Sequence, residues 1–551
     1  MISKSEIPTL TTQIPQDFVQ AIAKERGVTD AELETVFMAL NGQPTAAIAT
    51  RLGISDIAVR KRLGEVYKKF KIGGSGPGKL AELRHQLLFL YQAGQTPGQL
   101  IPAGRATASA VAIAHRYEDW GEAPDVSVFY DRTEELAAIK QWIVSDGCRL
   151  VALLGLGGSG KTTLAVKAAK LVQDEFDFII WRSLRAAPST EDLLGNLISI
   201  FSNHSKSDLP LDLNAKISRL VEYLRKHRCL LILDDFEMVL STGELAGHYR
   251  PGLESYRELI VRLGEVNHNS CLILLSSEEP TELALMSGEK VRSLKPLASE
   301  EIARELFAEK GLSAKEKDWK VLMSRYGGNL LALKIVAAII QDFFEGNIFK
   351  FLEATGLFIE DHISNLLAQQ FERLSNSEQE IMYWLAIAQN PVSLTKLRED
   401  ILVKSSLSDL LKNLESLGRR SLIEKINEGG EIFFTLQPLI MKYVAEDVAE
   451  QLRTEILEAI KTQGTEKMRL LKTHYFGKGT AKGKGGKANL TRSVLIMVKN
   501  SLQALFMQTT GSEESLNILA KVASTLQEKS QLEVGYAGEN IRNILAEMTS
   551  A

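Results

Sequence analysis

One glycine-rich segment, residues 155–163, restricts what this chain can fold into more than any other feature. It reads Gly-Leu-Gly-Gly-Ser-Gly-Lys-Thr-Thr, follows an apolar run at 150–154 and precedes a helix-favouring run at 164–172. A strand, a glycine loop and a helix in this order let backbone N–H groups and the helix N-terminus surround a polyphosphate. The segment therefore predicts a nucleotide-binding domain: a parallel α/β sheet of the P-loop type with helices on both faces.

Each residue of this segment, called the phosphate loop below, is a candidate for contact with ATP or ADP. The predicted binding residues are Gly155, Leu156, Gly157, Gly158, Ser159, Gly160, Lys161, Thr162 and Thr163. The glycines allow the backbone to wrap the phosphates. Lys161 is predicted to reach the β- and γ-phosphates, and the Thr162 hydroxyl is predicted to be a ligand of Mg²⁺.

A second apolar run, at 229–233, ends in two carboxylates, Asp234 and Asp235. A buried strand delivers such acids to the edge of a parallel sheet, where ligands bind. We expect Asp234 to hold the magnesium ion and Asp235 to orient or deprotonate an attacking water, so that Asp234, Asp235 and Lys161 form the catalytic set. A third run at 270–275 ends in Ser276 and Ser277, which either sense the γ-phosphate or simply form a turn.

Composition is that of a large globular protein. The 551 residues predict three to five domains, and a net charge of -4 argues against a surface that is basic throughout. The three cysteines have no paired or metal-binding spacing, which favours reduced thiols. No apolar leader is visible at the N-terminus, and the most apolar stretch, 330–340, is too short for a membrane span. These features predict a cytoplasmic protein without membrane contact.

The first 75 residues are predicted to form a separate helical module, with helices at 30–40, 45–52 and from a Ser55 cap to about residue 71. The segment around 47–55, followed by a basic helix, resembles the helix-turn-helix of LuxR/FixJ-type response regulators. The basic side chains of that helix are Arg60, Lys61, Arg62, Lys68 and Lys69. Two interpretations stay open: the module binds DNA through these side chains, or, as we favour, it docks another protein.

Residues 76–125 are predicted to be a linker with one helix at about 80–93, because glycine and proline are frequent and periodicity is weak. The nucleotide-binding domain is predicted to span 126–297. A helical domain is predicted at 298–370, and its first helix opens with Ser299 as a cap. A winged-helix domain is predicted at 371–450, with a capped helix after Leu374 and a β-hairpin that turns at 428–430.

Residues 451–551 are predicted to be a helical region with a Gly/Lys-rich loop at 477–487. That loop is either an exposed linker, which we favour, or a contact for an acidic partner or nucleic acid. The sequence contains no repeat of roughly 40 residues with Trp-Asp signatures. Either a sensor built from such repeats is missing from this chain, or it belongs to another polypeptide.

From residue 128 onward the chain resembles NB-ARC domains of the STAND signalling NTPases. The resemblance rests on the segments 128–136, 178–185, 294–297 and 326–333, in that order, and runs over about 126–445. It implies a plan similar to plant resistance proteins and apoptotic protease-activating factors, and most similar to cyanobacterial multidomain members that continue into WD-type repeats. It also implies that Arg132 lines the adenine site.

Four positions depart from the family pattern. Asp131 takes the place of a glycine at the adenine site, and Leu330 replaces the proline that packs on the base, so Leu330 is the predicted contact there. The segment 276–278 lacks the arginine that senses the γ-phosphate in relatives, and 436–438 reads Leu-Gln-Pro instead of Met-His-Asp. The intact phosphate loop predicts nucleotide binding, and the missing arginine predicts slow hydrolysis.

These features together indicate a signal-transduction switch. It is expected to bind ADP or ATP with Mg²⁺, to hydrolyse ATP slowly and to form a homo-oligomer in the ATP state, with an unknown signalling protein as partner. The alternative is a transcription regulator whose DNA binding through residues 1–75 is gated by nucleotide. A metabolic kinase or GTPase is disfavoured, because the sequence shows no guanine-binding Asn-Lys-x-Asp motif and no substrate domain.

Overall fold

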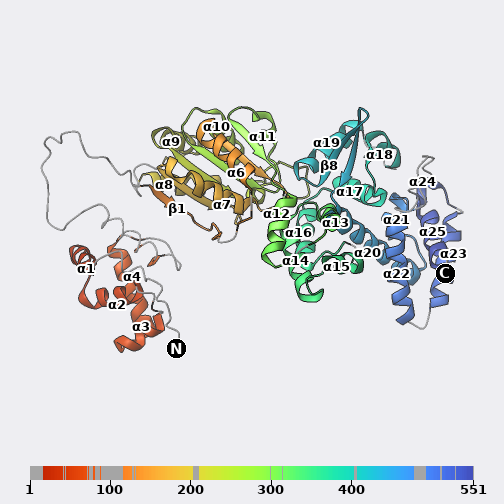
Figure 1. Cartoon of the computed structure of the whole chain (residues 1–551), viewed down its shortest axis with the longest axis horizontal. Helices are drawn as coiled ribbons and strands as arrows, with labels where there is room; N and C mark the ends of the chain where they lie inside the picture. Colours follow the sequence, from red (N-terminus) through yellow and green to blue (C-terminus); the bar gives the residue numbers. More distant parts are fainter. Residues whose placement is uncertain are drawn as a thin grey trace. The chain divides into compact units, whose positions relative to one another are not determined.

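The computed structural model describes residues 16–80, 83, 87 and 116–549, with internal gaps. The gaps are 41–42, 44, 71, 73–78, 127–128, 131, 203–209, 298, 313, 356, 402–405, 477–491, 509–511 and 528. Asp131, the Gly/Lys-rich loop at 477–487 and most of the predicted helix at 80–93 therefore lie outside the described residues. Met1–Ala112 and Ile113–Ala551 form two compact units, whose elements are labelled in Figure 1.

The described residues of the first unit contain four helices. They are α1 (Gln16–Glu25), α2 (Asp30–Leu40), α3 (Thr45–Leu52) and α4 (Asp56–Lys69). The helices expected at 30–40 and 45–52 are present, and Ser55 caps α4 by accepting a hydrogen bond from the Ala58 amide at 3.2 Å. Ile48 and Val59 are buried between α3 and α4. The local turn signals therefore place these helices correctly.

The second unit begins with a six-stranded parallel sheet in the order β1-β3-β4-β5-β2-β6. Its strands are β1 (Tyr117–Asp119), β2 (Leu150–Leu154), β3 (Phe178–Ser183), β4 (Cys229–Asp234), β5 (Cys271–Ser276) and β6 (Val291–Leu294). The central strands are apolar along almost their whole length because helices cover both faces of the sheet. The predicted fold class is confirmed.

The sheet starts earlier than the predicted domain boundary at residue 126. Tyr117 pairs with Phe178, so β1 adds an edge strand from a segment that was predicted to be linker. The three residues of β1 are half-buried and two of them are acidic. An edge strand of this kind carries no apolar run, which is why the sequence pattern did not reveal it.

Helices cover the two faces of the sheet. One face packs against α8 (Thr190–Phe201), α9 (Leu213–Lys226) and α10 (Ser255–Glu265). The other packs against α6 (Thr133–Lys140), the π-helical turn η2 (Gln141–Ser145) and α7 (Lys161–Val172). Along β2, Ala152 faces the first layer, while Val151 and Leu153 face the second. This alternation holds the phosphate loop, which joins β2 to α7, on a rigid base.

Helices follow the sheet from residue 300 to 372. They are α12 (Glu300–Glu309), α13 (Glu316–Tyr326), α14 (Leu330–Phe343), α15 (Ile348–Thr355) and α16 (Asp361–Glu372). Ser299 caps α12, as its position predicted, by accepting a hydrogen bond from the Ile302 amide at 3.4 Å. The helices expected between 298 and 370 are present.

The next segment alternates helices with short strands. Its elements are α17 (Asn376–Ala388), β7 (Val392–Ser393), α18 (Leu394–Asp400), α19 (Leu407–Arg419), β8 (Ile423–Glu428) and β9 (Glu431–Leu436). The strands form a sheet in the order β7-β9-β8. Gly429 and Gly430 make the two-residue turn between β8 and β9, with φ values of 61° and 84°. Both residues need positive φ in such a turn, so the double glycine located the hairpin correctly.

The predicted boundary at residue 450 is wrong, because it falls inside the continuous helix α20 (Pro438–Thr462). Five further helices follow: α21 (Leu470–Thr473), α22 (Arg492–Gln508), α23 (Ser512–Gln527), α24 (Gln531–Val534) and α25 (Ala537–Thr549). One hydrophobic core runs from Ile302 through α20 to Ile544. The apolar spacing of α20 continues across residue 450, so no local signal marks a division there.

No helix in the described parts of the chain combines the length and the apolar character that a membrane span requires.

Candidate functional site

The phosphate loop has the backbone geometry that an anion cradle needs. Gly158 and Gly160 have φ values of 81° and 87°, in the left-handed region that side chains with a Cβ rarely adopt. Gly160 is the N-cap of α7, so the first free N–H groups of that helix face the loop. Positive φ values place successive amides on the concave side, where phosphate oxygens are bound in loops of this type.

Lys161 lies inside this loop. Its Nζ donates hydrogen bonds to the carbonyl oxygens of Gly155 at 2.7 Å and Leu156 at 3.1 Å. Burial lowers the pKa of Lys161, and nearby carboxylates, including that of Glu237, act in the opposite direction. An ammonium group that is held only by carbonyls at the mouth of a cradle is positioned to transfer its hydrogen bonds to phosphate oxygens.

Two oxygen ligands for a magnesium ion lie next to each other. Thr162 Oγ1 donates to Asp234 Oδ1 at 3.5 Å. Thr162 lies on α7, and Asp234 is the last residue of β4. Burial, together with the neighbouring charge of Asp235, raises the pKa of Asp234 to about 6. A bound divalent cation would favour the ionised carboxylate, so the donor set suits Mg²⁺.

Asp235 follows directly and has an unusual backbone. Its φ of 56° and ψ of 39° place it in the left-handed region, where a non-glycine residue stores strain. Ser183 Oγ donates to its Oδ2 at 3.2 Å, and Arg185 Nε lies 3.5 Å from the same oxygen. The turn separates the two adjacent carboxylates, and Ser183 and Arg185 orient the second one at the end of β3.

These side chains share a single cavity of about 980 Å³. Of the predicted residues, those that line it are Gly157, Gly158, Gly160, Lys161, Thr162, Thr163, Asp234, Asp235 and Leu330. Gly155, Leu156, Ser159 and Arg132 lie outside the lining. The volume suits a nucleotide-sized ligand. The parallel strands explain the convergence, because the carboxyl ends of β2, β3 and β4 meet at one edge of the sheet.

Arg132 lies behind the loop in this structure, not on the cavity. Its Nη2 donates to the carbonyl oxygen of Ser159 at 2.7 Å, and its side chain is buried, which lowers its pKa. Among the described residues, Arg132 Nη1 and Ser159 Oγ are buried without a hydrogen-bond partner. These polar atoms make the loop incompletely satisfied without a ligand, and the adenine contact of Arg132 stays a prediction.

The N-terminus of α14 closes over the phosphate loop from the other side. The Leu331 amide donates to the Gly158 carbonyl at 3.1 Å, and Asn329 Nδ2 donates to the Gly157 carbonyl at 3.1 Å. A Cβ added to Gly158 would lie 2.8 Å from the Leu331 Cβ. Glycine is therefore required at position 158 for two reasons: the positive φ of the backbone and the close approach of Leu331. This approach also brings Leu330 to the cavity.

The serines at the end of β5 are held within the protein. Ser276 Oγ donates to the Glu278 carbonyl at 2.6 Å. The Ser277 amide donates to Glu237 Oε2 at 3.1 Å, while Gln370 Nε2 donates to Ser277 Oγ at 3.2 Å. Of the two interpretations of this segment, the contacts favour the turn.

Sequence reasoning missed three cations that line the cavity: Arg250, Lys334 and Arg373. They come from separate segments, and no shared motif connects them. The only sequence signal was Lys334, a charge inside an otherwise apolar helix. They add positive charge to a lining that also contains Glu237 and Glu372, and positive charge suits a polyphosphate.

Comparison with known proteins agrees with this geometry. Residues 132–242 match the family model described as the NB-ARC domain. The chain is similar to a WD repeat-containing protein of Nostoc sp., with 43% identity over 477 residues that cover 79% of this chain and 37% of that protein. It is also similar to the disease resistance protein RPM1 of Arabidopsis thaliana, with 33% identity over 101 residues, 17% of this chain and 11% of that protein. The chain thus spans well under two thirds of the length of these relatives.

Solved structures with similarity include a Walker-type ATPase of Pyrococcus abyssi, with a TM-score of 0.41 and 16% identity, covering 57% of this chain and 96% of that one. A STAND protein with a tetratricopeptide repeat sensor from Pyrococcus horikoshii has a TM-score of 0.31 and 16% identity, covering 78% of this chain and 66% of that one.

Proposed function

Because residues 132–242 form an NB-ARC domain, we propose that this chain is a signalling switch that binds ADP or ATP together with Mg²⁺. The observation that carries the proposal is the shared cavity, in which the phosphate loop, Lys161 and the Thr162–Asp234 pair converge. These groups would not have to move to bind a phosphate, because the phosphate loop, the Lys161 ammonium group and the metal ligands already lie together.

Each residue then has a defined task. Lys161 would bind the terminal phosphates, and Thr162 and Asp234 would hold the magnesium ion, which neutralises phosphate charge when it is bound. Asp235, oriented by Ser183, would accept a hydrogen bond from the attacking water. Hydrolysis is proposed to be slow, because the segment after β5 carries Glu278 and lacks the arginine that the resemblance to NB-ARC domains leads us to expect there.

Switching follows from the two-sided cavity. Its lining includes the phosphate loop on one side and residues of α14 and α16, such as Leu331 and Gln370, on the other. A ligand that touches both sides stabilises one arrangement of the two parts over another only through its differential contacts. We propose that ADP holds the closed arrangement, that ATP favours an open one, and that the open form assembles into a homo-oligomer with a signalling partner.

The test is titration of the purified chain with ADP and with a non-hydrolysable ATP analogue, together with size-exclusion chromatography in each nucleotide. We expect binding of both nucleotides and a larger assembly with the ATP analogue only. Asp235→Asn should slow hydrolysis and leave binding unchanged. Rapid multiple-turnover hydrolysis by the monomer would contradict a switch, and absence of ADP binding would refute the site.

A second function is a DNA contact through the N-terminal unit, since Arg60, Lys61 and Lys68 are exposed on α4. Against it, Lys69 forms an ion pair with Glu32 at 2.6 Å and Lys68 one with Glu65 at 2.8 Å, so part of the basic helix is already neutralised. We therefore propose protein docking as the first role of this unit. A sequence-specific, salt-resistant gel shift on genomic fragments would favour DNA binding instead.

A further inference from the structure

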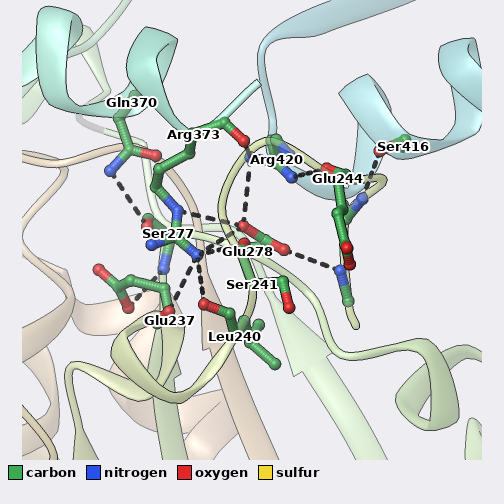
Figure 2. Close-up of polar contacts among 12 residues, drawn as sticks. Glu237, Leu240, Ser241, Glu244, Ser277, Glu278, Gln370, Arg373, Ser416 and Arg420 are labelled. Atoms are coloured by element: carbon green, nitrogen blue, oxygen red, sulfur yellow. Dashed lines mark hydrogen bonds and ion pairs between the residues drawn. The ribbon is translucent and has the colours of Figure 1, made fainter. Parts of the chain in front are cut away.

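Glu278, which follows β5, is the centre of a buried polar cluster (Figure 2). Its Oε2 accepts hydrogen bonds from Arg373 Nη2 at 3.0 Å and Nε at 3.3 Å, and lies 3.5 Å from Arg420 Nη1. Its Oε1 accepts a hydrogen bond from the Gly247 amide at 2.7 Å. A carboxylate that is 1% exposed is thus bound by two guanidinium groups from other segments.

Arg420 extends the cluster toward the helices that follow α16. Its Nη1 donates to the Arg373 carbonyl at 2.8 Å, its Nη2 donates to the Glu244 carbonyl at 2.7 Å, and its Nε lies 3.6 Å from Glu378 Oε1. Ser416 Oγ donates to the same Glu378 oxygen at 2.6 Å. The two arginines and two glutamates balance in charge, which a buried group of this size requires. We call Glu278, Arg373, Arg420, Glu378 and Ser416 the junction cluster.

Arg373 differs from Arg420 in one respect: it also lines the nucleotide cavity. It follows α16 directly, and its Nη2 donates to the Glu237 carbonyl at 2.9 Å as well as to Glu278. Within the described residues, the hydrogen bonds of the Arg373 guanidinium are made by Nε and Nη2, and Nη1 takes part in none of them. One edge of the guanidinium is therefore fixed by Glu278, while the remaining nitrogen is available to a ligand in the cavity.

The end of β5 is the right place for such a contact. β5 pairs with β2, Leu154 lies opposite Ser276, and the Gly155 amide donates to the Ser276 carbonyl at 3.2 Å. The residues after β5 therefore adjoin the start of the phosphate loop. In this chain that position carries the acid Glu278, and the positive charge beside it is brought from α16 by Arg373.

We propose that Arg373 is the residue of this chain that binds the terminal phosphate of a nucleoside triphosphate, and that Glu278 is the residue that positions it. The inference rests on the proposed nucleotide site. A guanidinium presents five donors in a rigid plane, so one edge can hold a carboxylate while another nitrogen binds a phosphate oxygen. ADP lacks the terminal phosphate, so this contact would distinguish the two nucleotides.

The same contact would link the nucleotide to the junction. The Arg373 carbonyl accepts hydrogen bonds from Arg420 Nη1 and from the Gly243 amide at 2.9 Å. A displacement of Arg373 toward a phosphate therefore strains the contacts that join the loop at 240–247 to α16 and α19. Two other cations of the cavity lack this connection: Arg185 pairs with Asp235, and Lys334 lies over the ring of Tyr130. Arg250 donates to the Leu240 carbonyl at 3.1 Å, but within the described part of the chain it has no contact with Glu278.

The test compares two variants of the full chain, Arg373→Gln and Arg420→Gln, by calorimetric titration with ADP and with a non-hydrolysable ATP analogue. Both variants remove a partner of Glu278, but only Arg373 lines the cavity. We expect Arg373→Gln to weaken the triphosphate analogue roughly 10-fold or more and ADP by no more than about twofold, because one charge-assisted contact is lost. Arg420→Gln should leave the ratio of the two affinities unchanged.

Glu278→Gln provides the second measurement, since it keeps the shape of the side chain and removes its charge. Glu278→Gln should lower the ratio of the affinity for the triphosphate analogue to the affinity for ADP. Arg373→Lys should have a higher ratio than Arg373→Gln. An unchanged ratio in Arg373→Gln, or an equal loss in Arg420→Gln, would overturn the role of Arg373. Failure of the unmodified chain to bind ADP would instead refute the proposed function itself, so the two failures are distinguishable.

Discussion

The phosphate loop and the junction cluster both hold buried charge, but they are built in opposite ways. The loop takes its groups from consecutive residues at 155–163, and its geometry depends on glycines such as Gly158 and Gly160 at fixed positions. The cluster takes its groups from segments far apart in the chain, among them the end of β5, the end of α16 and the end of α19. A sequence motif therefore identifies the phosphate loop, because its geometry depends on the backbone of consecutive residues. No motif identifies the junction cluster.

The two regions also differ in what holds their charged groups, although each, in the part of the chain that the structure describes, contains a buried nitrogen without a hydrogen-bond partner, Arg132 Nη1 in the first and Arg420 Nε in the second. Around the loop, Lys161 is held only by carbonyls, and Arg132 Nη1 and Ser159 Oγ are unpartnered among the described residues. In the cluster, Glu278 receives donors on both of its oxygens. The first region is prepared for an added anion, whereas the second joins two parts of the protein. Each prediction below separates these roles.

The largest effect is expected from Glu278→Ala. The change leaves the buried guanidinium group of Arg373 without its carboxylate and leaves Arg420 with Glu378 alone, and breaking a buried pair in this way costs about 3–5 kcal/mol. Urea unfolding should show this loss in the free energy of unfolding. Glu279→Ala, at the adjacent and less buried position, is the control. Equal stability of the two variants would show that the cluster does not hold the junction.

Lys161→Ala should have the reverse profile, with little change in stability and a loss of nucleotide binding. Removing the ammonium group is expected to lower the affinity for ADP and ATP by roughly 100-fold, or about 3 kcal/mol. Lys167→Ala is the matched control, since Lys167 lies on the same helix over the ring of Phe129 and outside the cavity lining. Unchanged ADP affinity in Lys161→Ala would remove the site.

A buried histidine of the second unit should make the stability of the protein depend on pH. His474 is buried against Trp384, and burial lowers its pKa to about 4 from an ordinary 6.5. The folded state disfavours the proton, so its contribution to stability is complete above pH 6.5 and is lost as pH falls toward 4. The total loss is about 3 kcal/mol. Urea unfolding at pH 7 and pH 5 should show a smaller difference in His474→Gln than in the unmodified chain.

The smallest effect on the free energy of unfolding is expected at a helix cap that adjoins the junction cluster. Ser375 caps α17 in a reciprocal capping box with Glu378, whose other oxygen belongs to the cluster. Ser375→Ala should cost about 1 kcal/mol, as at other caps. Ser299→Ala is the control, because the side chain of Ser299 caps α12 and, among the described residues, has no link to the junction cluster. A larger loss for Ser375 would show that the capping box also orients Glu378.

The sequence was informative wherever the constraint is local. The phosphate loop, the acids that end β4, the caps at Ser55 and Ser299 and the double glycine of the β8–β9 turn are all present as predicted. Each depends on the backbone geometry of a few consecutive residues, and few residue types satisfy that geometry. For this reason the nucleotide cradle could be located without any structure.

Only the tertiary structure showed the edge strand β1, the continuity of α20 across residue 450, and the meeting of Glu278 with Arg373 and Arg420. These features depend on contacts between segments far apart in the chain. The sequence does not show whether an arginine at the end of a helix contacts water, a carboxylate or a nucleotide. Its surroundings are set by packing, because burial determines which charges must be paired.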